Sequence, residues 1–141
     1  MKQTTLDNVK NFFSQYGWKY KALDSYQLIS GWKNGPLDYA LYVKTYSSFI
    51  KFHVPILQLL STDNLSQAQL LKKIIQINND IHLVRVHLEH QTISIQAEAL
   101  VKDFSYQQFN IFVGMIGYYA ETLHLELNEY LELINQTAFL H

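Results

Sequence analysis

The sequence predicts an α+β domain in which a five-stranded antiparallel sheet and three helices follow one another in the order α-β-β-β-α-β-β-α. Apolar residues recur every three to four positions in three segments, and they alternate with polar residues in the two segments between them. A content of 48% hydrophobic and 16% charged residues is typical of a packed protein. With 141 residues, we expect a single domain that spans residues 1–141.

The first segment predicts a helix that begins at Thr4 or Thr5, whose hydroxyl can cap it, and that ends at Gly17. The apolar positions of this helix are Leu6, Val9, Phe13 and Tyr16. From residue 18 to residue 57 the pattern becomes alternating, with turn residues at 24–25 and 33–36. We therefore expect three strands in this part of the chain.

Two of these strands divide clearly into two faces, because successive side chains of a strand point to opposite sides. The residues expected to meet the core are Leu37, Tyr39, Leu41 and Val43 on one strand, and Ile50, Phe52, Val54 and Ile56 on the next. Residues 45–48 are expected to form the hairpin between them. Pro55 predicts the end of an edge strand, since proline cannot donate a ladder hydrogen bond.

The middle of the chain predicts a second helix and then a β-hairpin. Residues 61–64 offer several caps for the helix, with Gln67 three residues after Asn64 in a capping-box position, and the helix is expected to reach about Ile77. Its expected core-facing residues are Ala68, Leu71, Ile74 and Ile75. The hairpin is expected to turn at residues 90–91. Its apolar face consists of Val84, Val86, Leu88, Ile93, Ile95, Ala97 and Ala99.

The last segment predicts a long helix that begins at a capping box made by Ser105 and Gln108. Its apolar stripe consists of Phe109, Val113, Ile116, Ala120, Leu123, Leu127, Tyr130 and Ile134. Gly114 and Gly117 inside this helix cost about 1 kcal/mol each relative to alanine. We therefore expect them to permit close packing against the sheet or a second helix.

The order of elements, the helix end Ile75-Gln76-Ile77-Asn78, the strand with Arg85 and the next strand with Glu98 together resemble the YbjN-like family. This bacterial family of uncharacterised function has the fold of type III secretion chaperones. The resemblance covers about residues 4–134 and implies a frequently dimeric protein, with helices on one side of the sheet and no established enzyme chemistry. In the chaperones such a dimer holds an extended segment of a client. This chain departs from them in its pI of about 6.6, because they are usually acidic.

The sequence offers little support for catalysis or for a bound metal or cofactor. No G-x-S-x-G elbow is present, and with no cysteine the chain has neither disulfides nor thiolate ligands. His82 and His90 are expected on the strand face opposite to that of His87 and Glu89. At most two of them would then meet one ion, whereas zinc takes three or four protein ligands. We therefore expect a protein that is not an enzyme, with no catalytic residue, cofactor or metal.

Nucleic acid is a weaker candidate partner than protein. Five lysines alternate with aromatic residues in the first half of the chain: Lys19, Lys21, Lys33, Lys44 and Lys51 with Trp18, Tyr20, Trp32, Tyr42 and Tyr46. Aromatic side chains on a sheet can stack on bases. The net charge of −1 is far from the strongly basic balance of such domains, so nucleic-acid binding is not favoured.

The function we favour from the sequence is the binding of another polypeptide by a homodimer, through the sheet face that points away from the core together with a sheet edge or a dimer cleft. The expected contact residues are Tyr42, Tyr46, Phe49, Arg85 and His87. Exposed aromatic and arginine side chains usually carry most of the energy of an interface. The structural alternative is that Tyr42 and Phe49 form a cross-strand pair that only stabilises the sheet.

The competing function is a small-ligand or enzymatic site in a pocket between the sheet and the last helix, around Tyr39, Met115 and Tyr119. The residues before Asp7 lack the pattern of a signal peptide, and no apolar run approaches the roughly 18 residues that span a bilayer. We therefore expect a cytoplasmic protein that does not enter a membrane.

Overall fold

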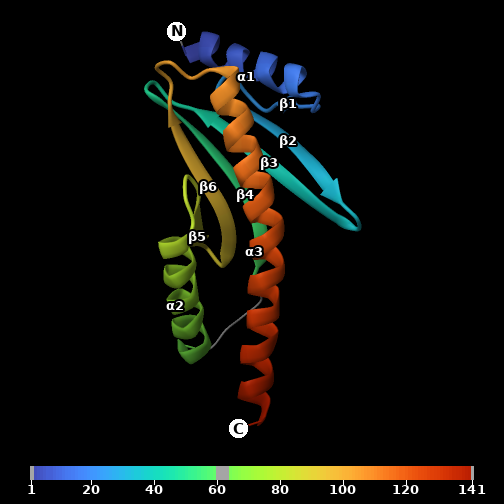
Figure 1. Ribbon diagram of the computed structural model, residues 1–141, viewed down its shortest axis with the longest axis vertical. Helices are drawn as coiled ribbons and strands as arrows, with labels where there is room; N and C mark the ends of the chain where they lie inside the picture. Colours follow the sequence, from blue (N-terminus) through green and yellow to red (C-terminus); the bar gives the residue numbers. More distant parts are fainter. Residues whose placement is uncertain (1, 60–63, 141) are drawn as a thin grey trace.

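The computed structural model describes the backbone of residues 2–59 and 64–140 (Figure 1). The helices are α1 (Lys2–Tyr16), α2 (Asn64–Asp80) and α3 (Tyr106–Leu140). The strands are β1 (Lys21–Ala22), β2 (Gln27–Asn34), β3 (Leu37–Thr45), β4 (Phe49–Gln58), β5 (Arg85–Glu89) and β6 (Thr92–Leu100). This is the predicted α+β order with one additional strand near the N-terminus.

The sheet has six strands in the order β1-β2-β3-β4-β6-β5, and each neighbouring pair is antiparallel. The prediction of five strands is therefore wrong by one. The additional strand is β1, whose two residues pair with Ile29 and Leu28 of β2. Two residues are too few to show an alternating pattern, so only pairing in space reveals this strand.

One side of the sheet carries the hydrophobic core, and we call it the inner face. Figure 1 shows α3 lying across the sheet along the long axis of the molecule, with α1 at its N-terminal end. The core cluster joins residues of all three helices to the inner-face residues of the strands. Phe52 of β4, Phe13 of α1 and Phe109 of α3 are fully buried in it. The predicted core faces of β3 and β4 are confirmed.

The prediction for the core-facing side of α2 is partly wrong. Ile74 is buried as expected, but its buried companions are Leu70 and Ile77. Ala68 is exposed, Leu71 is 43% exposed and Ile75 is 61% exposed. The helix is therefore rotated relative to the expected face, because the strand and helix that it contacts select Leu70 and Ile77. The residues expected to cap it, 61–64, lie outside those whose side chains are described.

Pro55 does not mark an edge strand, because β4 lies in the interior of the sheet between β3 and β6. Pro55 pairs with Ser94, and the register between β4 and β6 shifts between Pro55 and Leu57. Proline is tolerated at such an irregularity because the ladder is already interrupted there. The correction matters for function because it places the polar side of β4 at the middle of the sheet.

The end of α1 and the start of α3 follow the sequence. The backbone N–H groups of Gly17 and Trp18 both donate to the carbonyl of Phe13, which ends α1 as predicted. Ser105 and Gln108 make the reciprocal capping-box hydrogen bonds at 3.2 and 3.3 Å. The start of α1 differs from the prediction, since Thr4 and Thr5 lie inside a helix that begins at Lys2.

The predicted role of the two helix glycines is wrong for the contacts within this chain. A Cβ atom added at Gly114 or at Gly117 would meet nothing within 4 Å. Neither glycine is therefore needed to bring α3 close to the sheet or to another described helix.

The described helices include none that is long and apolar enough to cross a membrane.

Candidate functional site

The candidate site lies on the outer face, the side of the sheet whose side chains point away from the core. Tyr42 is on this face of β3, opposite His53 of β4. His53 is opposite Gln96 of β6, which in turn is opposite Arg85 of β5. These four residues form a row across four strands, which we call the central row. At about 4.8 Å per strand, Tyr42 and Arg85 stand at its two ends about 14 Å apart.

One end of the central row is an aromatic stack. The rings of Tyr42 and His53 are nearly parallel, with centroids 4.9 Å apart and planes inclined by 13°. Burial and the nearby Lys51 ammonium hold the pKa of His53 below its ordinary value of 6.5, although Glu89 opposes the shift. The lowered pKa means that the His53 ring takes up a proton less readily than a free imidazole does. A neutral ring beside a tyrosine presents an apolar surface with hydrogen-bonding edges.

The second aromatic pair lies at the β3–β4 hairpin, near one end of the face. Tyr46 and Phe49 stack with centroids 4.3 Å apart and planes inclined by 11°. The Lys44 ammonium lies 5.2 Å from the centroid of the Tyr46 ring, within cation–π range. These residues and Tyr26 line a groove of about 580 Å³. The groove therefore combines aromatic walls with a lysine.

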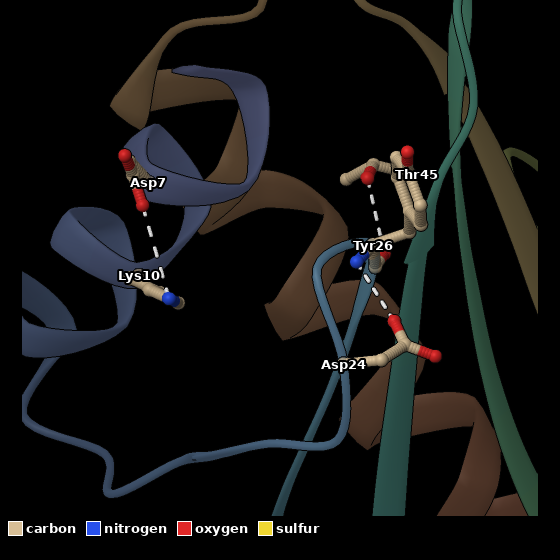
Figure 2. Close-up of polar contacts among 5 residues, drawn as sticks. All are labelled: Asp7, Lys10, Asp24, Tyr26 and Thr45. Carbon is tan, nitrogen blue, oxygen red and sulfur yellow. Dashed lines mark hydrogen bonds and ion pairs between the residues drawn. The ribbon is translucent and has the colours of Figure 1, made fainter. Parts of the chain in front are cut away.

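Hydrogen bonds hold the rim of this groove in place. Thr45 donates its backbone N–H and its hydroxyl to the carbonyl of Tyr26, at 2.8 and 3.0 Å. The N–H of Tyr26 donates to Asp24 at 2.7 Å, and this bond lowers the pKa of the Asp24 carboxyl. Figure 2 shows Asp24, Tyr26 and Thr45 linked in this way. The Asp7–Lys10 ion pair of α1 is drawn there too, as a separate contact.

The other end of the face is polar. Arg85 lies 3.7 Å from Glu98, and the Glu89 carboxylate lies 3.4 Å from His87 and 3.7 Å from His90. His53, His87, Glu89, His90, Ser94 and Gln96 are among the residues that line a groove of about 390 Å³ here. Ser94 and Gln96 are 8% and 5% exposed although they point away from the core. They form the floor of this groove.

The five predicted contact residues do not form one cluster. Tyr42 belongs to the central stack, Tyr46 and Phe49 to the hairpin groove, and Arg85 and His87 to the polar end. All five nevertheless lie on the outer face or at its hairpin end. The suggested cross-strand pair of Tyr42 with Phe49 is wrong, because the register places Tyr42 opposite His53.

Hydrogen bonds occupy part of the β5 edge and part of the β2 side of the sheet, which limits where a second chain could add to it. On β5, the side-chain amide of Asn78 bonds the N–H and the carbonyl of Val86, at 2.7 and 3.0 Å. The Asn78 side chain thus makes the two hydrogen bonds that a neighbouring strand would make to Val86. Along β2, the Ser30 hydroxyl donates to the carbonyl of Lys19 at 2.7 Å. The stacked rings of Trp18 and Trp32 continue this contact.

The region proposed for a pocket between sheet and last helix is packed with side chains. Tyr39 is 4% exposed, its hydroxyl is 2.9 Å from His124 Nδ1, and its ring stacks on Trp32. Burial raises the pKa of Tyr39, and Glu121 adds to this shift. Met115 and Tyr119 pack against the core. The described grooves considered above lie instead on the outer face.

The other candidate chemistries gain no support from the geometry. Among residues that the structure describes, no group of three or more histidine or acidic side chains could hold a metal ion. His90 approaches Glu89 rather than standing on the opposite face as expected. Of the basic and aromatic residues in the first half, Lys33 pairs with Asp38 at 3.8 Å. Trp18 and Trp32 stack on each other, so they are not displayed together with Tyr42 and Tyr46.

Sequence reasoning missed two residues of this region. It placed His53 on the outer face without assigning it a role, although the alternation with Phe52 and Val54 puts it on the same face as Tyr42. It used Asn78 only as a helix end, and nothing local indicates that its amide reaches Val86. The face of His53 follows from the alternation, but its pairing with Tyr42 depends on the register that the strands adopt, and the contact of Asn78 depends on how α2 packs beside β5.

These features describe an α+β protein with an antiparallel sheet, a helix-covered inner face and an aromatic, partly charged outer face. No family model matches the chain, and neither does any curated protein. Solved structures do match it in fold. YbjN from E. coli, described as a candidate transcription regulator, has a TM-score of 0.68 and 17% identity over 89% of this chain and 92% of its own.

Two further matches come from type III secretion systems. One is a chain of the heterodimeric ExoU–SpcU complex of Pseudomonas aeruginosa, with a TM-score of 0.59 and 14% identity over 82% of this chain and 94% of that one. The other is from the Yersinia pestis secretion chaperone SycH in complex with a fragment of YscM2, with a TM-score of 0.56, 12% identity and coverages of 87% and 99%. The expected likeness to YbjN and to the chaperones is confirmed at the level of the fold.

Proposed function

We propose that this protein is a cytoplasmic, non-enzymatic homodimer that binds another polypeptide across the outer face of its sheet. The observation that carries the proposal is the outer face itself. It presents two aromatic stacks, Tyr42 on His53 and Tyr46 on Phe49, beside grooves of about 390 and 580 Å³. Such a surface suits an extended segment that places side chains in both grooves.

The geometry favours binding to the face over binding to an edge. Asn78 occupies the hydrogen-bonding groups of Val86 on β5, and the segment before β1 runs beside β2. A client would therefore depend on side-chain contacts with the aromatic and charged groups rather than on strand addition. Arg85 and Glu98 at one end, and Lys44 at the other, offer charges of both signs for orienting it.

The fold comparisons support the polypeptide class of partner. Two of the three similar structures are described as complexes with a second polypeptide, and none of the three descriptions names a reaction. The lack of cysteine suits a reducing compartment. These points agree with a protein-binding role, and the identity of the client follows from experiment.

Site-specific photo-crosslinking tests the proposal. A photoreactive phenylalanine analogue replaces His53 at the centre of the outer face, and in a matched control it replaces Ile75 of α2, which is 61% exposed. In lysate of the native host, we expect the probe at position 53 to crosslink a discrete set of proteins that the probe at 75 does not. Mass spectrometry then identifies the client and the segment attached.

A double variant, Tyr42→Ala with Phe49→Ala, removes one ring from each stack. Added as an unlabelled competitor, it should displace the client from the probe at position 53 at least tenfold less effectively than the wild type, because exposed aromatic anchors usually carry an interface. Leu71→Ala with Ile75→Ala is the matched competitor on α2. Equal competition by all three proteins would show that the outer face does not bind the client.

A further inference from the structure

Helix α3 carries a line of exposed apolar side chains that nothing in the described chain covers. Ile111, Tyr118 and Leu125 are 50, 62 and 60% exposed and are spaced by seven residues. Seven residues are close to two helical turns, so the three side chains lie on one line along the helix. We call this line the α3 stripe. Figure 1 shows that α3 runs the length of the molecule, so the stripe is long.

The small residues between these side chains have no explanation within the chain. Gly114 lies between Ile111 and Tyr118, and a Cβ atom there would meet nothing within 4 Å. Glycine inside a helix is costly, so a close contact should compensate for it. Exposed Thr122 stands in the matching place between Tyr118 and Leu125. Large residues that alternate with small ones suit the interlocking of two helices.

The distribution of charge along α3 indicates which partner fits. The helix contains no lysine or arginine, and the exposed Glu129 and Glu132 follow the stripe in its C-terminal half. Its N-terminal end carries the positive end of the helix dipole, and the exposed Lys102 and Asp103 just before it have opposite charges. A second α3 helix running the other way would bring the acidic half of one copy beside the positive end of the other.

We propose that two copies of this chain associate through antiparallel α3 helices, with the two-fold axis near Tyr118. In this register Ile111 of each copy packs against Leu125 of its partner, and Gly114 faces Thr122. Glu129 then reaches the level of Gln107, and Glu132 lies level with residue 104, just beyond the N-terminal end of the partner's helix. In a parallel pair, Glu129 and Glu132 of one chain would lie beside Glu129 and Glu132 of the other, and repulsion between like charges opposes this arrangement. The outer faces remain free on the two far sides.

The inference rests on the dimer part of the proposed function and names its interface. Analytical ultracentrifugation over a range of concentrations should show a dimer for the wild type. Tyr118→Glu places two like charges at the axis and should weaken the dimer about thirtyfold or more, as expected for loss of a central aromatic contact. Ile75→Glu is the matched control, because Ile75 is 61% exposed on α2. Circular dichroism checks that each variant is folded.

Disulfide trapping tests the register. Because the chain has no cysteine of its own, any disulfide must join the introduced residues. A mixture of the Gly114→Cys and Thr122→Cys proteins should form mixed crosslinked dimers under mild oxidation. Each protein alone should crosslink poorly. Strong crosslinking of each variant with itself would mean a parallel pair and would overturn the proposed register.

The remaining outcomes separate this inference from the function proposed above. A wild type that is monomeric at every concentration would overturn the α3 interface together with the homodimer, while the crosslinking test of the outer face would still stand. A dimer that resists Tyr118→Glu but dissociates with Ile75→Glu would overturn the α3 interface alone.

Discussion

The two faces of the sheet differ in what surrounds their side chains. On the inner face Phe52 is fully buried, and its ring lies 6.0 Å from Phe112 and 6.2 Å from Phe104. On the outer face Tyr42 is half-buried, with the ring of His53 against one side. The inner face thus depends on helices to exclude water, whereas the outer face depends on neighbouring strands. Stability should therefore come mostly from one face, which leaves the other free to bind.

The largest effect should come from truncating a matched pair of aromatic residues on the two faces. Phe52→Ala should lower the free energy of unfolding by about 3–5 kcal/mol, because it leaves a cavity among helix and strand side chains. Tyr42→Ala should cost less, because it removes a ring pair worth about 0.5–1.5 kcal/mol and the burial of a side chain that is only half-buried. Urea denaturation followed by circular dichroism measures both. Equal losses would mean that the outer face is as much a structural core as the inner face.

An intermediate effect should come from the polar link at the β5 edge. Asn78→Ala removes both hydrogen bonds to the backbone of Val86, and we expect a loss of about 1–3 kcal/mol because a half-buried N–H and carbonyl lose their partner. Asn79→Ala, at the exposed neighbouring position, should change stability by less than about 0.5 kcal/mol. Denaturation midpoints compare the two. An Asn78→Ala protein as stable as the Asn79→Ala control would show that the edge does not need this amide.

The smallest effect should be the dependence of stability on pH, in which one histidine from each side takes part. Burial lowers the pKa of His124, which contacts Tyr39 on the inner side, and burial with Lys51 lowers the pKa of His53 on the outer face. Below pH 6.5 the unfolded chain takes up protons that the folded chain resists. Stability should therefore be highest above pH 6.5 and fall as the pH drops through the lowered pKa values.

Denaturation at pH 7.5, 6.5 and 5.5 measures this dependence, above the range in which Asp24 titrates. His53→Gln and His124→Gln should each make the decline shallower. Lys51→Gln should reduce only the His53 contribution, because Lys51 affects His53 and burial alone affects His124. A decline that neither histidine variant changes would contradict the assignment.

Much of the division between the two faces could be predicted from the sequence. The alternation of Tyr39, Leu41 and Val43 with Tyr42 placed each residue on the correct face, because the side-chain period of a strand is a local property. The capping box of Ser105 and Gln108 was equally predictable, since its partners are three residues apart. The α+β class and the order of the longer elements followed from the same local patterns.

The tertiary structure decided what local patterns leave open. The helical period of α2 allowed either Leu71 or Leu70 to face the core, and contact with the strands and α3 selected Leu70. Register alone paired Tyr42 with His53, and the position of α2 brought Asn78 to Val86. The sequence by itself therefore determined which side chains share a face, because that depends on backbone geometry over a few residues. Which side chains touch was decided only in three dimensions, because contact depends on segments that are distant along the chain.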